Sequence, residues 1–179
     1  MSWIEALVAN VKELFAFLAP FRIIKIYERG VVLRFGIPHR VMEPGWNWLW
    51  PFKIEDVAEV VVVEQTMDLM VQSVTTTDDV SATFSVNLVY CVSDPVAYHT
   101  AVTDFDRSAE GYARLHLAKR VRDKTWRELL DDQKALEASL KGTLSTRLKP
   151  WGAEVVDVGF TDLTRAKPFR LFQDPLLKG

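Results

Sequence analysis

The fold of this chain depends most on one stretch, residues 80–92, which reads VSATFSVNLVYCV. Every even-numbered position in it holds an apolar or aromatic residue, whereas positions 81, 83, 85 and 87 are polar. Because side chains alternate between the two faces of a strand, this pattern predicts one long strand with an apolar face and a mostly polar face. Such a strand is typical of an antiparallel sheet that has one buried face.

Turn signals bound this strand on both sides. The polar run 75–79 precedes it and ends in the adjacent carboxylates Asp78 and Asp79. Adjacent acids can serve acid–base chemistry or a metal, but aspartates in a turn usually bond nearby backbone N–H groups, and we interpret them so. Asp94-Pro95 ends the strand, because proline has no N–H group to donate to a neighbouring strand. Further strands are predicted at 57–63 and 66–74.

The region before residue 57 is rich in turn signals and aromatic residues. Residues 23–35 contain two short strand candidates, with a turn or bulge at Glu28-Arg29-Gly30. Trp46, Trp48 and Trp50 stand at alternate positions, so their rings would share one face of an extended segment. Two interpretations remain open: the rings contact a membrane interface, where tryptophan is favoured, or they cover the end of the sheet.

The second half of the chain has helical periodicity. A helix is predicted over 105–123, and its buried side is expected to hold Tyr112, Leu115, Leu117, Ala118 and Val121. This segment is also rich in lysine and arginine. We interpret these cations as a solvated helix face, with contact to anionic lipid or to an acidic neighbour as the alternatives.

Capping and leucine spacing define the remaining elements. Thr125 and Glu128 fit a capping box, which predicts that a short helix starts there. Leucines at 136, 140, 144 and 148 recur every four residues and predict an amphipathic helix that ends before Pro150. Gly152 then turns the chain into a final strand over 153–160.

Residues 2–19 predict an amphipathic helix that ends at Pro20. Its apolar arc consists of Trp3, Ile4, Leu7, Val8, Val11, Leu14, Phe15 and Leu18. The main interpretation is an anchor that lies in the plane of the membrane, and the alternatives are a partner helix or packing on its own domain. The sequence has no run of 18 uncharged apolar residues, so no ordinary spanning helix is predicted.

Composition and motifs argue against several classes of function. A net charge of -2 does not suit a general nucleic-acid binder, which needs surplus cations to neutralise phosphates. Cys91 is the only cysteine, and His39, His99 and His116 lack the spacing of a helical metal site. There is no phosphate-loop motif and no nucleophile elbow. We therefore expect a binding or structural role with no catalytic residue, cofactor or metal.

Six short motifs together resemble a known family. They are Glu28 to Gly36, Pro44-Gly45 with Pro51-Phe52, Thr77 to Val80, Asp94-Pro95, Leu129-Leu130 and Trp151-Gly152. In this order and spacing they resemble the SPFH or band-seven domain of stomatins, prohibitins and flotillins. The resemblance covers about residues 21–164.

The resemblance implies an α+β fold with a curved antiparallel sheet and a smaller α/β lobe. Here the amphipathic N-terminal helix precedes it. The expected organisation is an anchor helix at 1–20, the SPFH domain at 21–165 and a tail at 166–179. Family members usually continue into a long coiled coil, so the chain resembles a minimal version without it.

The resemblance also implies a function. We expect a membrane-associated scaffold that is not an enzyme, self-assembles, and organises or regulates membrane proteins such as proteases or channels. Its expected partners are membrane lipid, further copies of itself and a membrane protease or channel, with the domain on the cytoplasmic side. The membrane contact is expected from the eight residues of the N-terminal arc together with Trp46, Trp48 and Trp50. The alternative is a soluble adaptor that binds a partner protein through its N-terminal helix.

Overall fold

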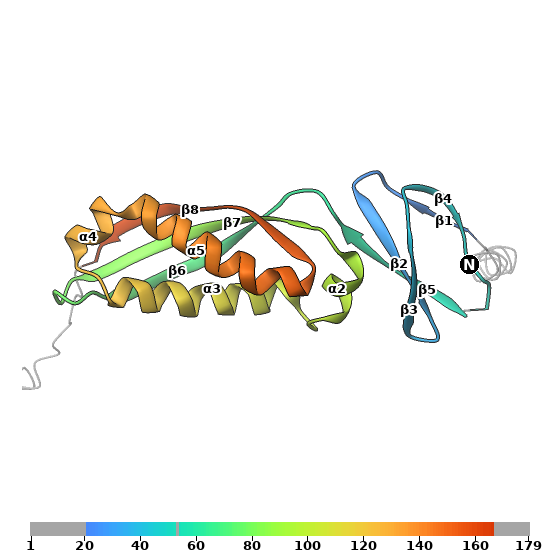
Figure 1. Ribbon diagram of the computed structural model, residues 1–179, viewed down its shortest axis with the longest axis horizontal. Coiled ribbons are helices and arrows are strands. Elements are labelled where there is room, and N and C mark those ends of the chain that lie inside the picture. Colours follow the sequence, from blue (N-terminus) through green and yellow to red (C-terminus); the bar gives the residue numbers. More distant parts are fainter. Residues whose placement is uncertain (1–20, 53, 167–179) are drawn as a thin grey trace, which may run out of the picture. The chain divides into compact units, whose positions relative to one another are not determined.

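The computed structural model describes residues 21–52 and 54–166, and in these residues the chain is an α+β protein, as expected (Figure 1). The expected N-terminal helix and the tail lie outside the described residues, apart from Ala166. The strands are β1 (Phe21–Ile24), β2 (Glu28–Arg34), β3 (Ile37–Met42), β4 (Gly45–Trp48), β5 (Glu55–Val61), β6 (Gln65–Thr75), β7 (Ser81–Val92) and β8 (Ala153–Arg165). The helices are α2 (Pro95–Thr100), α3 (Phe105–Arg122), α4 (Trp126–Asp131), α5 (Gln133–Leu148) and the short 3-10 helix η1 (Lys149–Trp151).

Contacts along the chain divide it into two compact units. Unit 1 consists of the chain up to Gln65 together with residues 90–105 and 145–156, and it contains β1 to β5. Unit 2 consists of residues 66–89, 106–144 and the chain from Asp157 onward. It contains most of β6, β7, α3, α5 and β8.

The long strand predicted at 80–92 is confirmed as β7, the central strand of the sheet β6-β7-β8. Its residues alternate without exception between half-buried odd positions and buried even positions, which include Phe84 and Leu88. The N–H group of Ala166 donates to the carbonyl of Ser81 at 2.8 Å, so the end of β8 lies beside the start of β7. The two strands therefore run antiparallel.

Helices α3 and α5 lie along the strands of this sheet (Figure 1). The leucine stripe of α5 is confirmed, because Leu136, Leu140, Leu144 and Leu148 are all buried. Glu137 of α5 accepts a hydrogen bond from the N–H group of Phe160 in β8 at 3.0 Å. These contacts fix α5 against the sheet.

The predicted buried side of α3 is only partly right. Leu117 and Val121 are buried, but Leu115 is 68% exposed. The buried face is set by Phe105, Ala109 and Ala113, which continue the same four-residue step. The two alanines are fully buried, and their small side chains let the helix backbone approach the rest of unit 2 closely. Because this face of α3 is buried, Leu115 lies on the exposed side of the helix.

The turn before β7 has a structural role. Asp78 accepts hydrogen bonds from the Thr76 hydroxyl and from the N–H group of Trp126, the latter at 3.2 Å. The bond from Thr76 is the main cause that lowers the pKa of the Asp78 carboxyl, and the bond from Trp126 adds to it. The capping box of Thr125 and Glu128 at the start of α4 is confirmed. The turn is thereby joined to the first residues of α4.

Unit 1 contains two small antiparallel sheets, one of order β3-β2-β5 and one formed by β1 and β4. The turn or bulge predicted at Glu28-Arg29-Gly30 is wrong, because β2 runs through Gly30 and its pairing with β3 becomes irregular only between Val32 and Leu33. The turn before β2 lies at 25–27. A Cβ atom on Gly30 would lie 3.0 Å from Ile24 Cδ1 and from Val57 Cγ1. Glycine at this position leaves room for the core of unit 1.

Two of the family-like motifs meet in unit 1. The N–H groups of Ser93 and Asp94 donate to the carbonyl of Gly152 at 2.9 and 3.0 Å. The Asp94 carboxylate caps the short helix α2, accepting from the N–H groups of Val96 and Ala97. Asp94-Pro95 thus ends the strand and starts a helix that the sequence analysis did not predict. Gly152 holds this corner in place.

Candidate membrane-contact surface

The sheet of β1 and β4 has an apolar outer face. Phe21 pairs with Trp48, and Ile23 pairs with Trp46. Because directly paired residues of an antiparallel ladder point to the same side, these four side chains share one face. Their exposed fractions range from 47% to 66%. The rings of Phe21 and Trp46 stack with centroids 6.0 Å apart, and those of Trp46 and Trp48 lie 6.5 Å apart.

The opposite face of this sheet belongs to the core of unit 1. Ile24 is buried there with Val32 and Met42, and Leu49 and Val57 pack against them. Arg22 pairs with Glu59 of β5 at 2.8 Å. One side of the β1–β4 sheet is therefore fixed to the β3-β2-β5 sheet, and the aromatic side remains in solvent.

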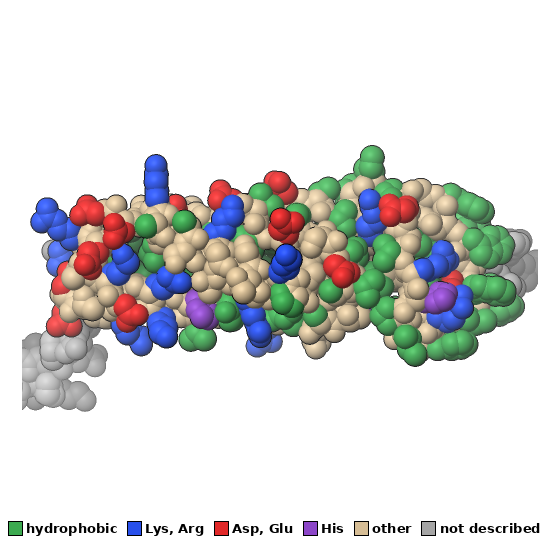
Figure 2. Space-filling view, in the orientation of Figure 1, with side chains coloured by type: hydrophobic (Ala, Val, Ile, Leu, Met, Phe, Trp, Pro, Cys, Tyr) green, Lys and Arg blue, Asp and Glu red, His purple; other side chains and the backbone are tan. Residues whose placement is uncertain are grey.

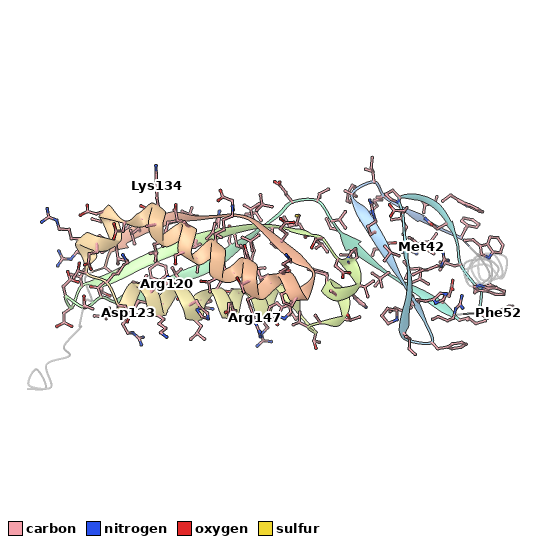
Figure 3. The ribbon with its side chains drawn as sticks, in the orientation of Figure 1. Met42, Phe52, Arg120, Asp123, Lys134 and Arg147 are labelled. Carbon is pink, nitrogen blue, oxygen red and sulfur yellow. The ribbon has the colours of Figure 1, made fainter. Side chains whose placement is uncertain are left out.

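A second group of exposed apolar side chains lies at one end of the β3-β2-β5 sheet. It consists of Phe35, Ile37, Trp50 and Phe52, which are 56–79% exposed. The pairing of Arg34 with both Ile37 and Glu55, and the bond from Phe35 N–H to the Ile54 carbonyl at 3.2 Å, bring these segments to the same end. Phe52 points away from the strands, whereas Met42 lies between them (Figure 3).

We call these eight residues the aromatic cap: Phe21, Ile23, Phe35, Ile37, Trp46, Trp48, Trp50 and Phe52. Figure 2 shows hydrophobic side chains gathered over the end of unit 1 that holds β1 and β4. Soluble monomers rarely expose a contiguous apolar surface made of several large side chains, and such surfaces usually mark interaction sites. The cap is therefore the candidate functional site.

Backbone strain coincides with the cap. Phe35 has φ 51° and is followed by Gly36 at φ 79°, in the two-residue turn between β2 and β3. Turns of this type favour asparagine or glycine at the first position, and a bulky residue with positive φ is an outlier. Phe52 likewise has φ 64°. Strained residues that persist in a structure often belong to functional sites, and here both present an exposed ring.

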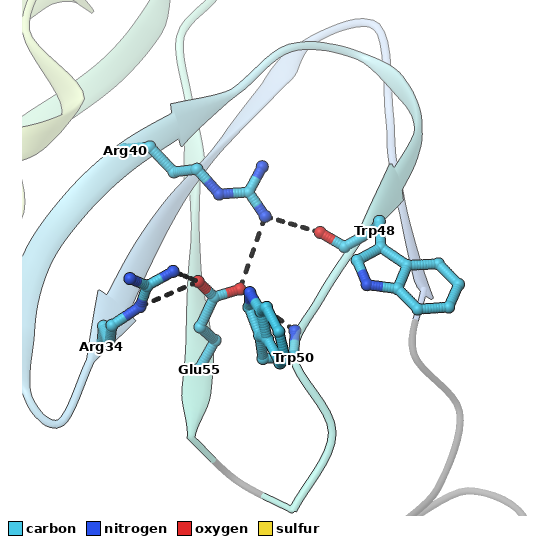
Figure 4. A network of polar contacts seen from close by, with 5 residues as sticks. All are labelled: Arg34, Arg40, Trp48, Trp50 and Glu55. Atoms are coloured by element: carbon cyan, nitrogen blue, oxygen red, sulfur yellow. Dashed lines mark hydrogen bonds and ion pairs between the residues drawn. The ribbon is translucent and has the colours of Figure 1, made fainter.

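A buried carboxylate holds the segment that carries Trp48 and Trp50 (Figure 4). The Glu55 side chain is fully buried and pairs with Arg34 at 2.7 Å and Arg40 at 3.4 Å. It also accepts a hydrogen bond from the N–H group of Trp50 at 3.2 Å, while Arg40 donates to the carbonyl of Trp48. Three strands and the connection between β4 and β5 are thereby joined through one carboxyl group.

The balance of these interactions lowers the pKa of Glu55. Burial by itself raises the pKa, because it disfavours the charged form. The hydrogen bonds from Arg34, Trp50 and Arg40 outweigh burial, so the pKa falls below the ordinary value of 4.5. A carboxyl group with a lowered pKa in the folded state stabilises the fold above its unfolded-state pKa. That contribution is lost as the pH falls through the folded-state value.

We expect Glu55→Gln to lower the free energy of unfolding at pH 7 by about 2–4 kcal/mol, because it leaves two partly buried arginines without their carboxylate. The loss should shrink below pH 4.5, where the wild-type carboxyl group becomes protonated during unfolding. Urea unfolding of both proteins at pH 7 and pH 4 measures this. A difference that stays the same at both pH values would contradict the assigned role of the charge.

The structure describes three of the eleven residues that the sequence analysis expected at the membrane. Trp46, Trp48 and Trp50 are all more than half exposed. The other eight, from Trp3 to Leu18, lie outside the described residues. Five further residues of the cap were not predicted at the membrane: Phe21, Ile23, Phe35, Ile37 and Phe52. The one local signal for any of them was Phe35-Gly36 between two strand-like runs.

The described residues contain neither a metal-ligand cluster nor an activated thiol. Among them no group of three or more His, Cys, Asp or Glu side chains could hold a metal ion. Burial raises the pKa of the Cys91 thiol, which makes the reactive thiolate scarcer. No helix within residues 21–52 and 54–166 is long and apolar enough to cross a membrane.

The chain is similar to several known proteins. It is 29% identical over 168 residues to an uncharacterised protein of Archaeoglobus fulgidus. That match covers 94% of this chain and 66% of the relative. It is 27% identical to a stomatin homologue of Pyrococcus horikoshii, over 79% of this chain and 53% of that one. It is 31% identical to the modulator of FtsH protease HflK of Escherichia coli, over 78% of this chain and 34% of that one.

This chain spans between about a third and two thirds of the length of these relatives. A family model for the SPFH domain / Band 7 family matches residues 22–170. That range includes the six motifs and the aromatic cap except Phe21. The chain therefore belongs to the SPFH domain / Band 7 family.

Proposed function

We propose that this protein is a membrane-associated scaffold that self-assembles and organises or regulates membrane proteins, such as a protease or a channel. It would do so without catalysing a reaction. The observation that carries the proposal is the aromatic cap. Tryptophan and phenylalanine side chains are favoured at the boundary between lipid headgroups and acyl chains, where an exposed apolar surface loses its contact with water.

Two further facts support the membrane part of the proposal. The predicted amphipathic segment ends at Pro20, and the next residue, Phe21, belongs to the aromatic cap. An anchor at 1–20 would therefore join the SPFH domain, residues 21–165, at its most apolar surface. In this proposal residues 166–179 form a tail, and the domain lies on the cytoplasmic side.

The regulatory part of the proposal is supported by family membership and by one relative. The relative in Escherichia coli is named a modulator of a protease. By analogy, a membrane protease or a channel is the partner class we propose for this chain. The scaffold function requires several copies to act together, and for this reason the proposal includes a homo-oligomer.

Liposome flotation tests the membrane part. We expect the full chain to float with vesicles and a variant with Leu7, Val11, Leu14 and Leu18 replaced by serine to bind much more weakly, because the helix loses its apolar arc. Binding of that variant at the wild-type level would remove the anchor from the proposal and leave the aromatic cap as the contact. If the wild type fails to float, a soluble adaptor that uses residues 2–19 on a partner protein becomes the better account.

A further inference from the structure

Helix α3 presents an unusual outer stripe in unit 2. The positions opposite its buried face are Arg107, Gly111, Leu115, Lys119 and Arg122, and all five are exposed. Leu115 is 68% exposed, whereas the large aliphatic side chains on the inner side of the helix, Leu117 and Val121, are buried. Within the described part of the chain, Lys119 and Arg122 form no ion pair. The stripe therefore offers one apolar side chain beside available positive charges.

A complementary surface lies at the corner between α4 and α5, also in unit 2. An open cavity of about 540 Å³ there is lined by Leu130 and Ala135 together with Asp131, Asp132 and Glu137. Leu130 is 49% exposed, so the cavity has an apolar contact site with acids around it. Lys134, the one lysine of the lining, points away from the helix body (Figure 3).

Two of the three acids of this corner, Asp131 and Asp132, form ion pairs that leave their carboxylates exposed. Asp131 lies 4.0 Å from Arg127, whose side chain is 92% exposed, and such a pair contributes little. Asp132 pairs with Lys124 at 3.0 Å, but the Asp132 side chain remains 54% exposed. Both carboxylates can therefore accept a second cation from outside the molecule.

We propose that the α3 stripe of one copy docks into the α4–α5 corner of a second copy. Leu115 would enter between Leu130 and Ala135, and Lys119 and Arg122 would face Asp131 and Asp132. Opposite charges around an apolar centre are the arrangement typical of specific interfaces. This inference rests on the self-assembly in the proposed function and specifies its contact.

Because the two surfaces differ, the contact is heterologous: each copy would use its stripe on one neighbour and its corner on another. Contacts of this kind form rings when the rotation closes and filaments when it does not. The proposal thus accounts for assembly beyond a dimer using residues of the folded domain alone.

Charge reversal separates the two surfaces. We expect full-length K119E/R122E and full-length D131K/D132K each to self-associate at least about tenfold more weakly than wild type, because like charges then face each other. An equal mixture of the two variants should assemble again, since each reversed surface meets its reversed counterpart. Sedimentation velocity measures all three samples. The control K149E/D162K reverses one charge of each sign outside both surfaces and should assemble as wild type does.

A cysteine pair provides a second measurement that retains the native charges. In a C91S background, L115C/A135C should form a ladder of covalent oligomers on oxidation, whereas L115C/T161C should not. Two results together would overturn this interface: charge-reversal variants that assemble like wild type, and no covalent ladder from L115C/A135C. Self-assembly would then use another surface. A wild type that stays monomeric in solution and on vesicles would remove self-assembly itself. Loss of vesicle binding by K119E/R122E with unchanged assembly would make the stripe a lipid contact and overturn the proposal.

Discussion

A Gly152→Val variant is expected to be destabilised by more than about 4 kcal/mol, the combined cost of a strained backbone and of overpacking. Gly152 has φ +80°, a region that branched side chains avoid. A Cβ atom there would lie 2.2 Å from the Asp94 carbonyl oxygen and 2.7 Å from the Tyr98 nitrogen. Both are backbone atoms, which cannot rotate away as a flexible side chain can.

Relief of this clash would break the corner itself. Moving Gly152 away from Asp94 removes the hydrogen bonds that the N–H groups of Ser93 and Asp94 donate to the Gly152 carbonyl. Urea unfolding followed by circular dichroism measures the loss, and recovery only in the insoluble fraction would count as the same result. A variant that unfolds at the wild-type urea concentration would contradict the structure of this corner.

Gly142→Ala is the matched control for the glycine argument. Gly142 lies within α5, and beyond its chain neighbours and its own helix backbone a Cβ atom there would meet no atom within 4 Å. Alanine is favoured over glycine inside a helix by about 0.5–1 kcal/mol, so this variant should be slightly more stable than wild type. The opposite signs of the two substitutions separate a local clash from a general effect of removing glycine.

The second large effect is expected from W46S/W48S, which should bind vesicles about 100-fold more weakly than wild type. The two side chains belong to residues that are 64% and 54% exposed, so each offers about 100–150 Å² of largely apolar surface. At about 25 cal/mol per Å² each can contribute about 3 kcal/mol. Because the interface is partly hydrated, we count half of this value for each ring. The pair then contributes about 3 kcal/mol, which is about a 100-fold difference in affinity.

Vesicle titration followed by sedimentation measures this change. The matched control is I26S/V63S, which also removes two exposed apolar side chains from unit 1. Ile26 lies just before the start of β2, and Val63 lies just after the end of β5. Phe35 and Glu55 are at the other ends of these two strands, so the control pair lies outside the aromatic cap. Equal weakening by both double variants would show that general surface hydrophobicity, and not the cap, determines binding.

Much of the fold could be predicted from sequence where the signal is local. The alternation in β7 and the leucine step of α5 depend on periods of two and four residues, which a single strand or helix determines by itself. The capping box at Thr125 is local in the same way. The chain resembled its family through six short motifs, and one of them, Thr77 to Val80, includes the carboxylate that joins the β6–β7 turn to α4.

The parts that could not be predicted depend on distant partners. Phe21 and Trp48 are 27 positions apart, and nothing near either of them indicates that β1 and β4 pair and share an aromatic face. Glu55 gave no signal because its role follows from Arg34 and Arg40 on two other strands. The buried face of α3 was predicted partly wrongly for a similar reason. A leucine was assigned to that face in place of two alanines, and the leucine proved to be exposed.

The central claim is that the aromatic cap contacts the membrane, and fluorescence quenching by lipids brominated on their acyl chains tests it most directly. The full-length variant W3F/W126F/W151F keeps only Trp46, Trp48 and Trp50. On vesicles that it binds, the account predicts strong quenching by brominated lipid relative to ordinary lipid. Equal emission on both kinds of vesicle, with binding confirmed by flotation, would place the three rings outside the bilayer and contradict the account.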